Sequence, residues 1–129
     1  MASITTPIPL AADADTVWAA VRDVGRPDLL FPGVLTDSRL EGDERVVTFA
    51  DGRVVRERIV TVDDDARRVA YAVVGGTLRH HNASMVVTAE ADGTSVLTWV
   101  TDLSPDEAAP LVGELMSRGA AAATAALGC

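Results

Sequence analysis

The chain has 129 residues, a formal net charge of −8 and 48% hydrophobic residues. This length and apolar content suit one domain, expected to span residues 1–129, with its own hydrophobic core. An acidic surface repels nucleic-acid phosphates and anionic lipid headgroups, so we expect neither nucleic acid nor a membrane as a partner. No apolar run approaches the roughly 20 residues of a membrane-spanning helix.

The cationic residues exclude one type of chemistry. All eleven are arginines, so no lysine side chain is available to form a Schiff base. The single cysteine, Cys129, excludes an internal disulfide and a zinc site built from cysteines. The N-terminal sequence MASITTPIPL lacks the features of a signal peptide, and together these observations predict a cytoplasmic protein.

The N-terminal part of the chain predicts a strand followed by two short helices. Ile4–Leu10 has the composition of a strand, and its two prolines favour the edge of a sheet. Asp13 is the expected N-cap of a helix that Gly25 and Pro27 end. The stretch PDLLFPGV predicts one more helical turn.

The middle of the chain predicts an antiparallel meander. Runs rich in Val, Thr and Ile alternate with turn sequences such as EGDE, ADGR, VGGT and EADGT. Short links of this kind join neighbouring antiparallel strands, so the sheet has seven strands when the first one is included. The six predicted strands are Leu35–Leu40, Arg45–Phe49, Val54–Val62, Val69–Val74, Leu78–Ala89 and Ser95–Leu103.

A long helix is predicted at the C-terminal end. Ser104 is the expected N-cap, Pro105 the first helical residue, and the helix runs to about Leu127. Pro110 either bends this helix or delays its start. Its broad apolar face is made of Leu111, Leu115, Met116, Gly119, Ala123 and Leu127.

The order of these elements resembles a known fold. The stretches that carry the resemblance are ADADTVWAAVRDV, FPGV, GTSVLTW and SPDEAAPL, and it covers nearly the whole chain. The chain resembles small bacterial members of the SRPBCC (START/Bet v 1-like) superfamily, which includes polyketide cyclase/dehydrase and lipid-transport proteins. The resemblance implies an α+β helix-grip fold, a curved seven-stranded antiparallel sheet around the C-terminal helix, with a cavity for a hydrophobic small molecule between them. It does not imply one activity, because members include both carriers and enzymes.

The last turns of the predicted helix, SRGAAAATAAL, contain mostly small side chains. Against a curved sheet such side chains could leave a hollow. Tight packing is the alternative, because alanine is also the best helix former. The resemblance favours the hollow.

Strand alternation predicts which side chains face the helix. The apolar residues Ala83 and Met85 share a face with His81, so His81 points inward and His80 outward. A two-residue turn at Gly75-Gly76 would instead place His80 on the face of Tyr71, unless the loop is longer.

The same reasoning places three polar or aromatic side chains inside. Trp99 is the bulkiest residue of its strand, so its face, with Thr101, is predicted to be the inner one. Glu57 inside is favoured over Arg56 and Arg58, because two buried arginines cost more than one carboxylate with a partner. The alternative is ordinary surface charge on an amphipathic strand.

Three functional hypotheses follow. The first is a binding protein for a hydrophobic or aromatic small molecule that is polyketide-, lipid- or sterol-like. The second is a polyketide cyclase or dehydratase that uses acid–base catalysis, with His81, Glu57 and Tyr71 as candidate catalytic residues. The predicted ligand-binding residues are Tyr71, His81, Met85, Trp99, Thr101, Leu115, Met116 and Gly119.

The third hypothesis is an interaction module without a small ligand, which forms a homodimer through outward Val86 and Val100. No metal is expected, because the adjacent residues His80 and His81 point to opposite faces of a strand. No cofactor is expected either.

Overall fold

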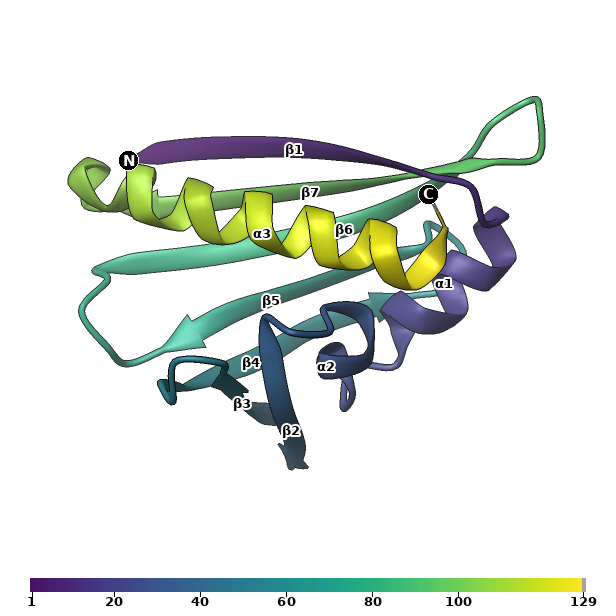
Figure 1. The fold of residues 1–129 in the computed structure, drawn as a ribbon. Helices are drawn as coiled ribbons and strands as arrows, with labels where there is room; N and C mark the ends of the chain where they lie inside the picture. The colour runs from purple at the N-terminus through teal and green to yellow at the C-terminus, as the bar shows by residue number, and fades with distance from the viewer. Residues whose placement is uncertain (129) are drawn as a thin grey trace.

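The computed structural model describes residues 1–128. Cys129, on which the prediction about disulfides and cysteine zinc sites depends, lies outside the described residues. Seven strands form one antiparallel sheet, and the helices lie against one of its faces (Figure 1). The strands are β1 (Ala2–Leu10), β2 (Leu35–Glu41), β3 (Glu44–Phe49), β4 (Val54–Asp63), β5 (Arg68–Val74), β6 (His80–Ala89) and β7 (Ser95–Ser104). The helices are α1 (Ala14–Arg22), α2 (Pro27–Leu30), the 3₁₀ helix η1 (Asp106–Ala108) and α3 (Ala109–Leu127).

The strand order is β1-β7-β6-β5-β4-β3-β2, so all strands after the first lie beside their neighbours in the chain. β1 pairs with β7, with Ala2 opposite Leu103 and Leu10 opposite Ser95. β1 is an edge strand, as its prolines predicted, because an edge strand does not need every backbone N–H. The predicted α+β architecture, with a seven-stranded sheet and a long C-terminal helix, is confirmed.

Helix α1 covers one end of the sheet. Asp13 is its N-cap, as predicted, and accepts a hydrogen bond from the Thr16 N–H at 2.8 Å. Val17 and Trp18 are buried on the sheet side, and the Trp18 indole donates to Asp64 at 3.0 Å. This end of the sheet is therefore filled by side chains from α1.

The C-terminal helix begins later than the sequence predicted. Ser104 is the last residue of β7 and not an N-cap, and η1 separates it from α3, which starts at Ala109. Pro110 lies in the first turn of α3, where its missing N–H would have no helical partner in any case. Pro110 thus delays the helix rather than bending it.

The connection between β5 and β6 is longer than a two-residue turn. Residues 75–79 form it, and β6 begins at His80 rather than at Leu78. Gly75 and Gly76 have φ angles of 74° and 80°, which favour glycine. The resulting register places Tyr71 opposite Ala83, so that His81 shares the inner face with Tyr71.

The alanine-rich end of α3 packs tightly, so the hollow predicted beneath SRGAAAATAAL is absent beyond Gly119. Ala123 is 0% exposed, and Ala120 and Ala122 pack against the core. Small side chains allow the helix to approach its neighbours closely, and protein interiors fill such space. The hollow lies instead beneath the first half of α3.

Candidate ligand-binding cavity

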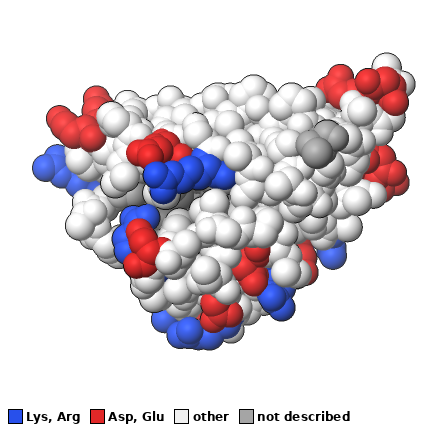
Figure 2. Space-filling model, in the orientation of Figure 1, with Lys and Arg blue, Asp and Glu red and all other residues white. Residues whose placement is uncertain are grey.

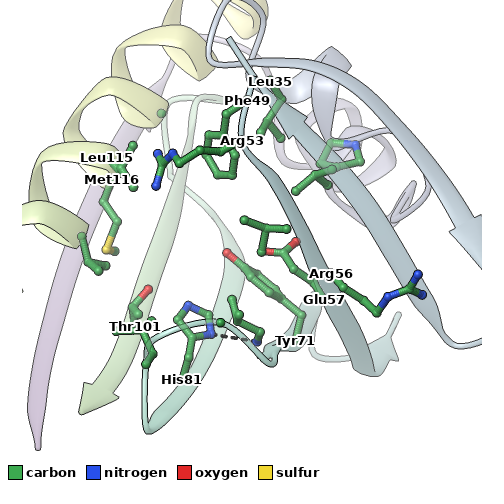
Figure 3. A pocket seen from close by; sticks show the side chains of 18 of the residues that line it. Leu35, Phe49, Arg53, Arg56, Glu57, Tyr71, His81, Thr101, Leu115 and Met116 are labelled. Atoms are coloured by element: carbon green, nitrogen blue, oxygen red, sulfur yellow. Dashed lines mark hydrogen bonds between the residues drawn. The ribbon is translucent and has the colours of Figure 1, made fainter. Parts of the chain in front are cut away.

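A cavity of about 340 Å³ lies between the first half of α3 and the inner face of the sheet (Figure 3). Four of the five aromatic side chains of the protein line it, and only Trp18 does not. The four are Phe31, Phe49, Tyr71 and Trp99. The wall is therefore mostly apolar and rich in aromatic rings.

The cavity opens to the surface beside the N-terminal end of α3. Val54 and Leu111 line it and are 62% and 58% exposed. Figure 2 shows arginine and acidic side chains around a hollow below α3. Two ion pairs lie in this region, Arg53 with Asp51 on the β3–β4 turn and an exposed pair on α3. The opening thus has an apolar rim with charged groups that are already paired.

A buried ion pair forms part of the wall. Arg45 Nε donates to Glu57 Oε1 at 2.8 Å, and the two side chains are 7% and 13% exposed. Arg45 also donates to the Val24 carbonyl at 3.1 Å, and its guanidinium lies 4.7 Å from the centre of the Tyr71 ring. Glu57 lies inside, as the sequence predicted, with a cationic partner that compensates its burial.

The neighbouring arginines of β4 form surface pairs. Arg56 Nη1 and Arg58 Nη2 donate to Glu44 at 3.1 and 3.0 Å. Arg56 also reaches the edge of the cavity. Of the charged residues of this strand, Glu57 points into the cavity and Arg56 points away from its centre (Figure 3).

Tyr71 and Trp99 are joined across the cavity wall. The Trp99 indole donates to the Tyr71 hydroxyl at 3.1 Å, and the Trp99 ring stacks on Phe31 with the ring centres 5.1 Å apart. Burial, with a smaller contribution from the charge of Glu57, raises the pKa of Tyr71 above its usual range. The phenol therefore stays protonated at physiological pH.

Gly119 allows α3 to pass directly over Trp99. A Cβ atom at position 119 would lie 2.8 Å from Trp99 Cζ3 and 3.5 Å from a ring carbon of Phe31. The first distance is too short for an ordinary contact, so a larger residue would displace the indole. Gly119 is thus a packing requirement at the inner end of the cavity.

His81 has one ring nitrogen fixed by the backbone. Its Nδ1 accepts a hydrogen bond from the Val73 N–H at 3.1 Å. The other ring nitrogen, Nε2, is turned toward the cavity (Figure 3). Burial is the main cause that lowers the pKa of His81, and the negative charge of Glu57 opposes it. His81 is therefore held neutral with its proton on Nε2.

The other histidine lies on the opposite face of the strand. His80 is exposed, and its Nε2 lies 2.5 Å from Asn82 Oδ1. No group of three or more His, Cys, Asp or Glu residues within positions 1–128 is arranged to hold a metal ion.

Thr101 lies beside His81 on the adjacent strand. The register of β6 and β7 places His81 opposite Leu103 and Ala83 opposite Thr101, so Thr101 is the diagonal neighbour of His81 on the inner face. Thr101 is 1% exposed and lines the cavity. Leu115 and Met116 of α3 line the wall on the helix side (Figure 3).

The structure brings nearly all the predicted site residues to one cavity. Those that line it are Glu57, Tyr71, His81, Trp99, Thr101, Leu115, Met116 and Gly119. The exception is Met85, which is on the predicted face of β6 but lies in the packed core beside Ala20 and Val21 of α1. Met85 pairs with Trp99 in the sheet, and α1 fills the space above it.

Sequence reasoning missed much of the wall, including a buried cation and two aromatic rings. Arg45, Phe31 and Phe49 line the cavity without having been predicted to do so. The alternation of β3 could have identified Arg45, because it shares a face with the apolar residues Val47 and Phe49.

The outer face of the sheet carries the residues of the third hypothesis. Val86 and Val100 are half-buried there, and they lie opposite Thr98 and Ser84 respectively. The homodimer stays a prediction. No helix in the part of the chain that the structure describes is long and apolar enough to cross a membrane.

Comparison with known proteins identifies the family. The family model for polyketide cyclase/dehydrase and lipid transport proteins matches residues 1–128. The chain belongs to this family. No curated protein sequence matched it.

Solved structures share the fold of this chain. Protein XoxI from Bacillus cereus has a TM-score of 0.86 at 22% identity, covering 98% of this chain and 96% of its own. A START superfamily protein from Mycobacterium smegmatis has a TM-score of 0.82 at 10% identity, covering 97% and 96%. Norcoclaurine synthase from Thalictrum flavum, in complex with dopamine and hydroxybenzaldehyde, has a TM-score of 0.69 at 22% identity, covering 96% and 82%.

Proposed function

We propose that this protein binds a hydrophobic or aromatic small molecule of the polyketide, lipid or sterol type in the cavity beneath α3. The observation that carries the proposal is a cavity of about 340 Å³ lined by four of the five aromatic side chains. Ligand pockets of proteins are typically apolar clefts with a few polar groups that orient the ligand.

Burial of apolar surface supports ligand binding at such a site. Burial of apolar ligand surface contributes about 25 cal/mol per Å² before the entropic cost of association is subtracted. The aromatic rings of the wall also offer stacking contacts. The complex of norcoclaurine synthase with dopamine and hydroxybenzaldehyde supports the idea that this fold accommodates aromatic compounds.

Ligand-dependent melting with aromatic ketone, fatty-acid and sterol panels tests this proposal. We expect at least one panel to raise the melting temperature, because a ligand that binds only the native state stabilises it. The variant Leu115→Trp fills the cavity and should abolish the rise, whereas Ser117→Trp on the exposed side of α3 should not. Absence of binding in native mass spectrometry and melting with all panels would contradict the proposal.

A second candidate function is acid–base catalysis on the bound molecule, as in a polyketide cyclase or dehydratase. The observation that favours it is a carboxylate, a phenol and an imidazole on one cavity wall, from Glu57, Tyr71 and His81. Nδ1 of His81 is occupied by the backbone and Tyr71 is protonated, so Glu57 is the base of this set. His81 Nε2–H would stabilise negative charge on a ketone oxygen.

Hydrogen–deuterium exchange of 1-tetralone in D₂O tests this second candidate. Glu57 would remove a proton from the carbon beside the carbonyl, and the enolate would take up a deuteron in return. NMR should show exchange faster than in buffer, and Glu57→Gln should reduce it to the buffer rate. Glu44→Gln on the outer side of the sheet is the matched control and should leave it unchanged. The same exchange rate with and without protein would contradict catalysis and leave the binding proposal intact.

A further inference from the structure

Two polar side chains of the cavity wall have hydrogen-bonding groups without a protein partner among the described residues. Among residues 1–128, neither His81 Nε2 nor Thr101 Oγ1 is hydrogen-bonded to another protein group (Figure 3). The only fully enclosed side-chain polar atom without a partner in that part of the chain is Ser38 Oγ, so the Thr101 hydroxyl is open to the cavity. We call His81 Nε2–H and Thr101 Oγ1–H the donor pair.

The geometry of His81 makes Nε2 a donor. The Val73 N–H can only donate, so Nδ1 of His81 must accept and carries no proton. A neutral imidazole has a single N–H, which is then on Nε2. Protonation of Nδ1 would place two donors against each other and break the backbone hydrogen bond.

The two donors act from the same side. His81 and Thr101 are diagonal neighbours on β6 and β7, and both side chains point to the inner face. Each buried group would gain a partner if one acceptor atom lay between them, and buried polar groups without partners are costly. The pair is thus arranged for a ligand oxygen.

The surrounding charges favour a neutral oxygen over a carboxylate. The buried cation of the wall, Arg45, is already bound to Glu57. Arg53 and Arg56, at the mouth, are paired with acidic residues outside the cavity. A ligand carboxylate next to His81 would be buried without a free cation and close to the charge of Glu57, which is unfavourable.

We infer that His81 and Thr101 together bind a neutral carbonyl or hydroxyl oxygen of the ligand, so that the natural ligand is an aromatic or alicyclic ketone, quinone or alcohol. This inference rests on the proposed function, because it needs a ligand in the cavity. It defines which end of the ligand is buried. The oxygen faces β6 and β7, and the apolar body faces α3 and the aromatic wall.

The experiment compares 1-tetralone with tetralin, which has the same bicyclic body and no oxygen. Their dissociation constants are measured by Trp fluorescence or calorimetry for the native protein and for Thr101→Val. Thr101→Val is isosteric and should lower the affinity for 1-tetralone relative to tetralin about five-fold, as expected for one hydrogen bond. Thr98→Val on the outer face of the same strand is the control and should leave the ratio unchanged.

A second measurement uses the native protein and therefore needs no substitution at His81. Long-range ¹H–¹⁵N NMR of the native protein should show His81 with a protonated Nε2 and an unprotonated Nδ1 near neutral pH. Addition of 1-tetralone should shift the Nε2–H signal, and tetralin should shift it much less. His81→Phe, where it folds, should lower the affinity ratio by the same factor as Thr101→Val.

The possible outcomes separate the inference from the proposed function. In one outcome, both compounds bind with a ratio of dissociation constants that Thr101→Val leaves unchanged. This result would contradict the role of the donor pair and would leave the cavity as a binding site. A proton on Nδ1 of His81 would also overturn it. Binding of neither compound would overturn the proposed function for ligands of this size, together with the donor pair.

Discussion

The two halves of α3 cover the same sheet in different ways. Beneath the C-terminal half, α1 side chains and closely packed alanines leave little space, and Ala123 is completely buried. Beneath the N-terminal half, the larger side chains of Leu115 and Met116 line a cavity. The half with the larger side chains is therefore the hollow one.

This contrast shows that the supporting elements, rather than side-chain size along one helix, decide where a cavity forms. α1 fills the sheet face at one end, whereas at the other end the β5–β6 loop and the β3–β4 turn border the cavity. Polar groups follow the same division. Arg45, Glu57, His81 and Thr101 all line the hollow end.

The largest expected effect comes from breaking the buried ion pair of the hollow end. Arg45→Met leaves the Glu57 carboxylate buried without its cation, and we expect a loss of about 3–5 kcal/mol in the free energy of unfolding. Urea denaturation measures this loss. The double variant Arg45→Met/Glu57→Leu should recover most of it, because it leaves no unpaired charge.

An exposed ion pair on α3 provides the control. Arg118→Met removes the i,i+4 partner of Glu114 and should cost no more than about 0.5 kcal/mol. Equal costs for Arg45→Met and Arg118→Met would contradict the description of the wall as a desolvated site.

Truncation of one apolar residue in each half tests the packing contrast directly. Met85→Ala opens a cavity in the close-packed end and should cost about 2–5 kcal/mol. Leu115→Ala only enlarges an existing cavity, so its cost should lie near the lower limit of that range or below it. A larger cost for Leu115→Ala than for Met85→Ala, measured by thermal or urea unfolding, would reverse the comparison.

Two glycines of α3 should respond to alanine with opposite signs. Gly119→Ala forces its Cβ against the Trp99 ring, and overpacking of about 1–3 kcal/mol outweighs the gain in helix propensity. At Gly113 the nearest atom is Ile4 Cδ1 at 3.8 Å, an ordinary contact, so Gly113→Ala should stabilise by up to about 1 kcal/mol. Melting temperatures of the two variants should shift in opposite directions, with changed Trp fluorescence for Gly119→Ala only.

The smallest effect concerns pH. The pKa of His81 is lowered in the native state, so below its unfolded value of 6.5 the unfolded chain binds a proton that the native protein does not. Stability should therefore fall as pH drops from 6.5 to the native pKa, with a slope of at most about 1.4 kcal/mol per pH unit. His81 is surrounded by Glu57, Tyr71 and His80, and the first of these opposes the effect.

The His81→Gln variant isolates this contribution. It should show a flatter pH dependence of the free energy of unfolding just below pH 6.5 than the native protein. Carboxylates with lowered pKa values, such as Glu44 and Asp64, lose their contribution only below their unfolded values of 4.5 and 3.8, so the two windows are separate. An unchanged slope in His81→Gln would show that His81 is not held neutral.

The order of elements was readable from the sequence because each has a local cause. Turn sequences with glycine separate the strands, Asp13 caps α1, and the prolines of β1 mark an edge. The predicted start of α3 was wrong. Ser104 has the chemistry of an N-cap, but its pairing with His80 keeps Ser104 in the sheet. Pairing between strands outweighed the local signal.

The site was partly readable for the same reason. Alternation along a single strand placed His81, Glu57 and Thr101 on the inner face. Alternation could not show whether Met85 lines the cavity or packs beneath α1. The answer depends on where α1 lies over the sheet, and α1 comes from a distant part of the chain. Alternation also could not show that Val73 holds one nitrogen of His81, since that contact depends on the length of the β5–β6 loop.

The pairing of β1 with β7 has a consequence for how the chain folds. Strands β2 to β7 pair with neighbours in the sequence, but Ala2 must pair with Leu103, which lies far along the chain beyond all the other strands. Such a distant closure has a high entropic cost, and sheets with many non-local pairs fold in milliseconds to seconds. During synthesis β1 leaves the ribosome first and stays unpaired until β7 has emerged, so its two prolines also help to protect an exposed strand from premature association.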